Sequence, residues 1–220
     1  MGNFIAIIGF VLYAYFLRVS SFITVLIAIG INIARVCCEE EKALLKIEKV
    51  DKNNFKDIPN PCKYCLYWQT SGPFDEKMLK PEMEGEKREW FKKVIAEFGN
   101  CAFVAYFSGV PIGFVQYAQP RFFPRVKKYA SGPPSEDAVF LACLYIADKE
   151  ARGRGLGMAM LEELLAELRK RKNKAVETFA RRNSVDNPSG PLELYLKHGF
   201  KIKSDKGDFP LLRFDFGRNR

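Results

Sequence analysis

The sequence predicts a mixed α/β domain that follows an apolar N-terminal segment. Strand-like apolar runs alternate with helical segments in the order β, α, α, β, β, β, α, β, α, β, β. One central run is apolar almost throughout, and a glycine-rich turn joins it to an amphipathic helix. The chain has 220 residues, a length that suits one globular domain with a sizeable core.

The N-terminal segment contains no acidic side chain and two basic ones, Arg18 and Arg35. Its apolar run spans residues 3–34, whereas a membrane-spanning helix needs about 20 apolar residues. One long tilted helix or a short hairpin that enters the bilayer and returns would fit this length. A signal peptide fits less well, because no basic side chain precedes the run. We therefore predict a membrane anchor in residues 1–36 and a folded domain in residues 37–220.

The charge that follows the apolar run predicts the localisation. Arg35 lies directly after the run, and the positive-inside bias then places the folded domain in the cytoplasm. The membrane is the partner expected for residues 3–34. The alternative is a soluble cytoplasmic protein whose start site is misassigned, so that the apolar stretch is not made.

The first half of the domain begins with a strand at residues 43–50, followed by a short helix and a turn at 51–61. Residues 101–107 and 111–118 are two strands separated by a short Ser-Gly-Val connection, which predicts a hairpin. Between these parts lies a helix at residues 81–98. It is indicated by an early proline and by apolar side chains at helical spacing, which are Trp90, Phe91, Val94, Ile95 and Phe98.

The second half opens with a long loop at residues 118–137. Residues 138–147 are almost all apolar, as expected of a central strand that is buried on both faces. The helix at residues 156–172 has an apolar stripe, which we assign to Met158, Leu161, Leu164, Leu165 and Leu168. The remaining elements are a strand at 174–180, a short helix at 191–199 and strands at 200–204 and 211–216.

The glycine-rich turn, RGRGLG at residues 152–157, precedes this helix. Glycines let backbone N–H groups approach a ligand closely, and the start of a helix adds unpaired N–H donors and a positive dipole end. With Arg152 and Arg154 alongside, such a turn suits a phosphate group. The spacing matches neither a P-loop nor a dinucleotide fingerprint. A tight strand-to-helix turn without a ligand is the alternative.

The cysteines and the net charge narrow the possible partners. Cys101 and Cys143 lie in apolar strand-like runs, which predicts reduced core residues. Cys62 and Cys65 form a C-x-x-C pair, but no second pair completes a zinc site, so we expect no metal. A redox role, packing or shaping of a substrate pocket remains open for this pair. The net charge of +9 favours anionic partners. No nucleic-acid reader motif is present, so we expect no nucleic acid as a partner.

Two motifs resemble those of the GNAT superfamily of acyl-CoA-dependent N-acyltransferases. RGRGLG matches the R-x-x-G-x-G pattern of that family and lies, as there, between a central strand and its long following helix. LYLKHGF, at residues 194–200, is similar to the family's L-Y-x-K-x-G-F. The resemblance implies a mixed central sheet flanked by helices, with acetyl-CoA as the co-substrate.

The resemblance also implies which residues hold acetyl-CoA. Backbone amides of the central strand and of the glycine-rich turn bind the cofactor in this family. An asparagine seven residues before the motif tyrosine is frequent there, whereas Asn187 lies eight residues before Tyr195. The implied cofactor-binding residues are Leu144, Tyr145, Ile146, Arg152, Gly153, Arg154, Gly155, Leu156, Gly157, Met158 and Asn187.

The catalytic role that the resemblance implies most directly falls to Tyr195, the family's proton donor to the departing thiolate. Family members differ in the general base, and Glu136, Asp137 and Glu177 are the candidates in this chain. The implied reaction is direct transfer of an acetyl group from acetyl-CoA to an amine acceptor, whose identity the sequence does not give. The alternatives are a non-catalytic acyl-CoA-binding or regulatory module and a membrane-surface adaptor.

Overall fold

The computed structural model describes residues 45–72, 79–182 and 189–217, and the residues from Leu45 onward form one compact unit. The predicted anchor and Asn187 lie outside these residues. Within the described ranges, no helix is long and apolar enough to cross a membrane. The anchor at residues 3–34 and the domain boundary at residue 36 therefore stay predictions.

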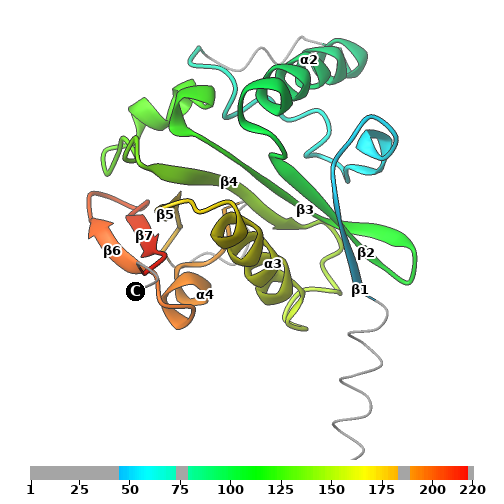
Figure 1. Cartoon of the computed structure of the whole chain (residues 1–220). Helices are drawn as coiled ribbons and strands as arrows, with labels where there is room; N and C mark the ends of the chain where they lie inside the picture. Colours follow the sequence, from blue (N-terminus) through cyan, green and yellow to red (C-terminus); the bar gives the residue numbers. More distant parts are fainter. Residues whose placement is uncertain (1–44, 73–78, 183–188, 218–220) are drawn as a thin grey trace, which may run out of the picture. The chain divides into compact units, whose positions relative to one another are not determined.

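In the described part of the chain, seven strands form one sheet in the order β1-β2-β3-β4-β5-β7-β6 (Figure 1). Neighbouring strands are antiparallel, except for the parallel pair β4 and β5. The strands are β1 (Leu45–Lys49), β2 (Ala102–Phe107), β3 (Val110–Ala118), β4 (Ala138–Ile146), β5 (Ala175–Phe179), β6 (Lys201–Ser204) and β7 (Leu211–Asp215).

The centre of the sheet has two irregularities. The β4–β5 pairing spans three residue pairs and ends at Phe140 and Glu177, although β4 continues to Ile146. Between β3 and β4, Gln116 pairs with Cys143 and Tyr117 pairs with Leu141, so Ala142 is an extra residue on β4. Such a bulge bends a strand and leaves a residue unpaired. The C-terminal part of β4 therefore keeps backbone groups that β5 does not use.

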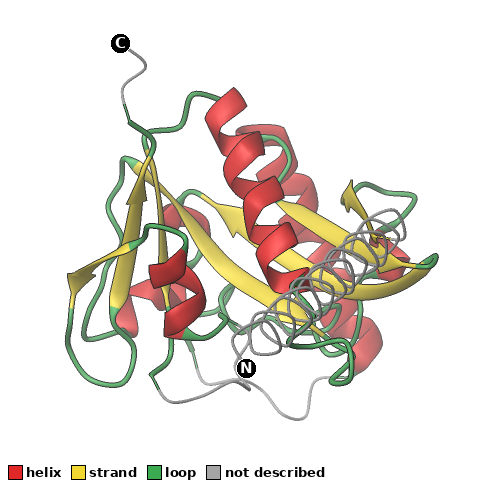
Figure 2. Cartoon of the chain, turned by 90° about the horizontal axis from the view of Figure 1, so that it is seen from below, coloured by secondary structure: helices red, strands yellow, loops and turns green. Residues whose placement is uncertain are grey.

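Helices cover both faces of this sheet (Figure 2). Helices α3 (Leu156–Lys170) and α4 (Leu192–Lys197) pack against one face, in a core that includes Leu164 and Tyr195. Helix α2 (Lys80–Phe98) packs against the other face through Phe91 and Val94. Short 3-10 helices accompany α2 on that side, and those that the structure describes are η1 (Phe55–Asp57), η2 (Pro120–Phe122) and η3 (Pro124–Lys128).

The predicted mixed α/β fold is confirmed, and the bounds of α2, α3, α4 and the described strands agree with the predictions to within two residues. The short helix predicted near the start of the domain is the 3-10 helix η1, and η2 and η3 lie in the segment predicted as a long loop. Two side-chain assignments were wrong. Met158 is 42 % exposed, and Met160 takes its place on the buried face of α3. Ile95 is exposed on α2, whereas Lys87 is buried there. The other assigned positions of both helices are buried or partly buried, so the predicted apolar faces are otherwise correct.

Candidate active site

The glycine-rich turn connects the end of β4 to α3. Gly153 and Gly155 have φ angles of +79° and +82°, in the left-handed region that favours glycine. A β-carbon at Gly153 or Gly157 would meet no described atom within 4 Å. The turn thus presents a backbone surface that side chains do not cover.

The first turn of α3 adds hydrogen-bond donors to this surface. Gly155 is the N-cap residue, and no side chain caps the helix there. The first N–H groups of a helix have no partner within it, and the aligned peptide dipoles make this end positive. Because α3 is 15 residues long, its N-terminus can attract an anion to the turn.

Two arginines add positive charge around the turn. Nε of Arg152 donates to the Ile146 carbonyl at 3.0 Å, and its guanidinium lies 5.3 Å from the centre of the Tyr145 ring. Arg154 is exposed and lies 5.7 Å from the centre of the Phe107 ring. The structure thus brings the predicted cofactor-binding residues of β4 and of the turn into one continuous region, with Leu144 buried and Met158 exposed.

Tyr195 is completely buried on α4, and its hydroxyl donates to the Ser189 carbonyl. Burial raises the pKa of this hydroxyl, and the Thr178 hydroxyl opposes that rise. Thr178 in turn donates to the Leu141 carbonyl at 2.9 Å, next to the bulge in β4. Tyr195 therefore remains a protonated donor at neutral pH, linked through Thr178 to the irregular part of β4.

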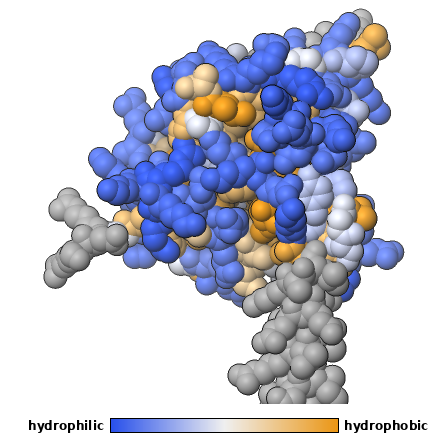
Figure 3. Space-filling model, turned by 45° about the vertical axis from the view of Figure 1, so that its right-hand side comes forward, coloured by the Kyte–Doolittle hydropathy of each residue, from blue (hydrophilic) through white to orange (hydrophobic). Residues whose placement is uncertain are grey.

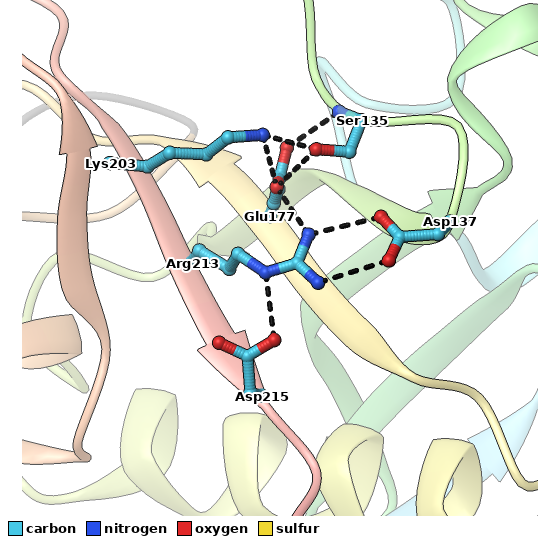
Figure 4. A network of polar contacts seen from close by, with 6 residues as sticks. All are labelled: Ser135, Asp137, Glu177, Lys203, Arg213 and Asp215. Atoms are coloured by element: carbon cyan, nitrogen blue, oxygen red, sulfur yellow. Dashed lines mark hydrogen bonds and ion pairs between the residues drawn. The ribbon is translucent and has the colours of Figure 1, made fainter.

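Glu177, a predicted candidate for the base, lies in a closed network of ion pairs (Figure 4). Its carboxylate accepts from Lys203 at 2.7 Å, from Arg213 at 2.8 Å, and from the Ser135 N–H and hydroxyl at 2.8 and 2.9 Å. Burial alone would raise the pKa of Glu177, but these donors outweigh it and hold the pKa below its ordinary value. A fully buried carboxylate with these partners is a weak proton acceptor, so the predicted role does not fit.

The other two candidates for the base lie far from the glycine-rich turn. Asp137 accepts two hydrogen bonds from Arg213, which hold its pKa below the ordinary value against a small effect of burial. Glu136 is exposed beside it, directly before β4. Phe140, near the start of β4, is already six residues from Ile146, or about 20 Å along a strand. Neither carboxylate lies at the end of β4 that joins the turn.

The C-x-x-C segment belongs to the core on the α2 face. The Cys62 and Cys65 thiols are free, and burial raises the pKa of Cys62 to about 12. Cys101 and Cys143 are free and buried, as predicted. Trp68 is buried among aromatic rings, with its ring centre 5.1 Å from that of Phe140. Among the described residues, no group of His, Cys, Asp and Glu side chains is arranged to hold a metal.

The molecular surface shows no large apolar area on the face seen in Figure 3. Hydrophilic residues predominate there, and hydrophobic residues form small separate groups. Single exposed apolar residues are ordinary in soluble domains. On this face, the surface offers no sign of an apolar docking site.

The fold is similar to that of several solved acetyltransferases. The yncA protein from Salmonella typhimurium, a putative acetyltransferase solved with acetyl-CoA, is 15% identical with a TM-score of 0.54, and the match covers 80% of this chain and 95% of that one. An N-acetyltransferase from Staphylococcus aureus Mu50 is 17% identical with a TM-score of 0.52, covering 78% and 98%. A ribosomal-protein-alanine N-acetyltransferase from Brucella melitensis is 18% identical with a TM-score of 0.50, covering 78% and 99%.

Sequence comparison gives the family. No curated protein matches the chain. The model of the acetyltransferase (GNAT) family matches residues 62–200, which is more than half of the chain and includes both predicted motifs. The chain therefore belongs to the GNAT family of acetyltransferases.

Proposed function

We propose that the protein transfers an acetyl group from acetyl-CoA directly to an amine acceptor. The observation that carries this proposal is the uncapped N-terminus of α3 behind the glycine-rich turn, at the end of β4. The pyrophosphate of acetyl-CoA has the charge and size that such a turn accepts. Family membership supports the same cofactor.

In this proposal, the glycine-rich turn binds the pyrophosphate of acetyl-CoA and β4 binds the acyl arm. Backbone N–H groups of Gly153, Gly155 and Gly157 face the pyrophosphate, and Arg152 and Arg154 supply positive charge. The acyl arm lies along the C-terminal half of β4, where pairing with β5 has ended. Preorganised backbone donors beside the bulge then polarise the thioester carbonyl.

Tyr195 is the proton donor to the departing thiolate in this mechanism. Its hydroxyl is protonated at neutral pH, and the Thr178 hydroxyl connects it to the Leu141 carbonyl. A hydroxyl hydrogen-bonded to a backbone carbonyl is free to exchange that partner for a stronger acceptor, such as a thiolate. Acetyl transfer then ends with free CoA and an acetylated amine.

Binding is tested by thermal unfolding with and without acetyl-CoA. A ligand that binds the native state raises the melting temperature by mass action. Gly155→Glu places a carboxylate against the phosphates and should abolish the shift. Gly207→Glu is the matched control, because Gly207 also has a positive φ of +72° and open space around it, in the described residues, but lies between β6 and β7. A shift that survives in Gly155→Glu would show that the turn does not bind the cofactor.

Catalysis is tested with Tyr195→Phe, which removes one hydroxyl and little volume. A screen of amine acceptors, with release of free CoA thiol as the readout, first identifies an acceptor. We expect kcat to fall by about 10²–10⁴ while the acetyl-CoA melting shift is retained. Normal turnover in a folded Tyr195→Phe protein would point to a packing role. CoA binding without turnover in the wild type would favour the non-catalytic module.

We further propose that residues 3–34 anchor the domain to a membrane with the domain in the cytoplasm. The support is the apolar sequence and Arg35 alone. A chain that begins at Glu39 should be soluble and should keep the acetyl-CoA melting shift, whereas the full chain should sediment with membranes. If the full chain stays in the supernatant, this segment is not an anchor.

A further inference from the structure

Lys87 is a buried lysine with an unusual environment. It lies on α2 with 2% of its surface exposed. Lysines are almost never buried to this extent unless they are paired. No carboxylate in the described part of the chain forms an ion pair with it, and its hydrogen bonds go to neutral acceptors. Such a site favours the neutral amine over the ammonium ion.

The hydrogen bonds of Lys87 are no more than a neutral amine can donate. Nζ donates to the Cys65 carbonyl at 2.7 Å and to Oε1 of Gln116 at 2.9 Å. A neutral amine has two N–H donors and one lone pair, so these two bonds use both donors and leave the lone pair available. Desolvation also lowers the pKa of Lys87, and the titratable groups around it are the thiols of Cys143, Cys65, Cys62 and Cys101.

Gln116 brings this amine next to the strand that leads to the glycine-rich turn. It is fully buried on β3 and pairs with Cys143 on β4, beside the bulge. Cross-strand neighbours of this kind have Cα atoms about 5 Å apart. Nε2 of Gln116 is buried and has no hydrogen-bond partner among the described residues, which marks a polar site that these residues do not complete.

Lys87 and Tyr195 approach the centre of the sheet from opposite faces. Lys87 belongs to α2 and lies 5.9 Å from the centre of the Phe114 ring, in the core on the α2 face. Tyr195 belongs to α4 and lies in the core on the α3 face. A group held along β4 would have a proton acceptor on one side and a proton donor on the other.

We propose that neutral Lys87 is the general base that deprotonates the acceptor ammonium, directly or through one water. The inference rests on the proposed acetyl transfer. The ammonium gives a proton to the Lys87 lone pair, and the resulting amine attacks the thioester carbon, forming a C–N bond. The C–S bond then breaks, Tyr195 protonates the thiolate, and the proton lost by the new amide nitrogen restores Tyr195. Lys87 finally releases its proton to solvent, which accounts for the one proton that the reaction produces.

The sharpest test is Gln116→Glu, which is nearly isosteric and places a carboxylate 2.9 Å from Nζ. The new ion pair keeps Lys87 protonated, so a base role predicts loss of rate at neutral pH and recovery at higher pH. A structural role predicts instead that the rate does not change, because the new salt bridge preserves the contact between the two side chains. Gln119→Glu is the matched control, since it adds the same charge three residues away beside Arg121.

Two small probes separate deprotonation from the rest of catalysis. Ethylamine is an ammonium ion at pH 7, whereas hydroxylamine is neutral and needs no base before attack. With acetyl-CoA and ethylamine, Gln116→Glu and Lys87→Met should each lower kcat by about 10²–10⁴ at pH 7, the usual contribution of a general base. With hydroxylamine, both variants and Gln119→Glu should stay close to the wild-type rate.

The outcomes are distinct. If the acceptor screen finds no amine that the wild type acetylates, the proposed function fails, and this inference fails with it; an acceptor other than ethylamine found in that screen takes its place as the ammonium probe. If the wild type acetylates both and the variants slow neither, or slow both equally, Lys87 is not the base although the proposed function stands. Should Gln116→Glu fail to fold, Lys87→Met gives the same comparison. If neither folds, the wild-type kcat decides: its acidic limb must be present with ethylamine and absent with hydroxylamine.

Discussion

Two buried ionisable side chains, Glu177 and Lys87, have opposite surroundings. Glu177 accepts hydrogen bonds from two cations and from Ser135, in a network that joins β5, β6, β7 and the segment before β4. Lys87 donates to one carbonyl and one amide oxygen and has no carboxylate partner among the described residues. These surroundings therefore favour the charged form of Glu177 and the neutral form of Lys87.

This difference shows that burial by itself does not mark a catalytic group. A buried charge with good partners is held in one protonation state, and its chemistry is suppressed. A buried amine without a counter-ion loses its proton more readily than an amine in water. The partners decide the role, and these come from distant parts of the sequence.

The largest effect should come from breaking the Glu177 network. Arg213→Met removes a cation whose side chain is 20% exposed and leaves Lys203 as the one cationic partner of Glu177 among the described residues. We expect a loss of about 3 kcal/mol, near the lower end for breaking a buried pair. Lys203→Met should cost about 1 kcal/mol or less, because that side chain is 36% exposed. Urea unfolding measures both.

Asp215→Asn is the control for these two variants. It removes a partner of Arg213 that is 66% exposed, so the free energy of unfolding should change by less than about 0.5 kcal/mol. Equal losses in all three variants would show that the network does not depend on the buried carboxylate.

The second effect concerns stability in acid. The pKa of Glu177 is lowered in the folded state. Its contribution to the free energy of unfolding is therefore present above the unfolded pKa of about 4.3 and is lost as pH falls through the folded pKa. Asp137 and Asp51 also have lowered pKa values, so the wild type alone does not isolate Glu177. The difference in unfolding free energy between wild type and Glu177→Gln should shrink below about pH 4. A constant difference would contradict the assignment.

The last effect concerns stability between neutral and alkaline pH. The pKa of Lys87 is lowered in the folded state. Between that folded pKa and the unfolded pKa of about 10.4, the unfolded chain binds more protons than the folded chain. Wild-type stability relative to Lys87→Met should therefore rise with pH in this window. Subtraction of the variant removes the opposing contribution of the buried thiols, whose pKa values are raised. If this difference in unfolding free energy does not change with pH, Lys87 keeps its proton in the folded protein.

Local periodicity was sufficient to predict most elements. The apolar run of β4, the glycines before α3 and the early proline of α2 each act within a few residues, where backbone preferences and side-chain spacing decide the conformation. The glycine-rich turn was found in the same way, whereas the motif around Tyr195 was found through its resemblance to the GNAT family. One further signal was present but missed, because Lys87 lies four and seven residues before Phe91 and Val94 and so shares their helix face.

Contacts across the sheet could not be predicted from such patterns. Glu177 looked like any carboxylate on a strand until the β5–β7 pairing placed Arg213 beside it. Lys87 meets Gln116, 29 residues away, because α2 packs over β3.

The sequence by itself thus determined the order of helices and strands, the glycine-rich turn and the family motifs, since these depend on neighbours along the chain. Tertiary structure alone decided which buried groups are paired and which are not. The physical reason is that the pKa of a buried group depends on charges and hydrogen bonds within a few ångströms, and folding brings those groups from separate elements.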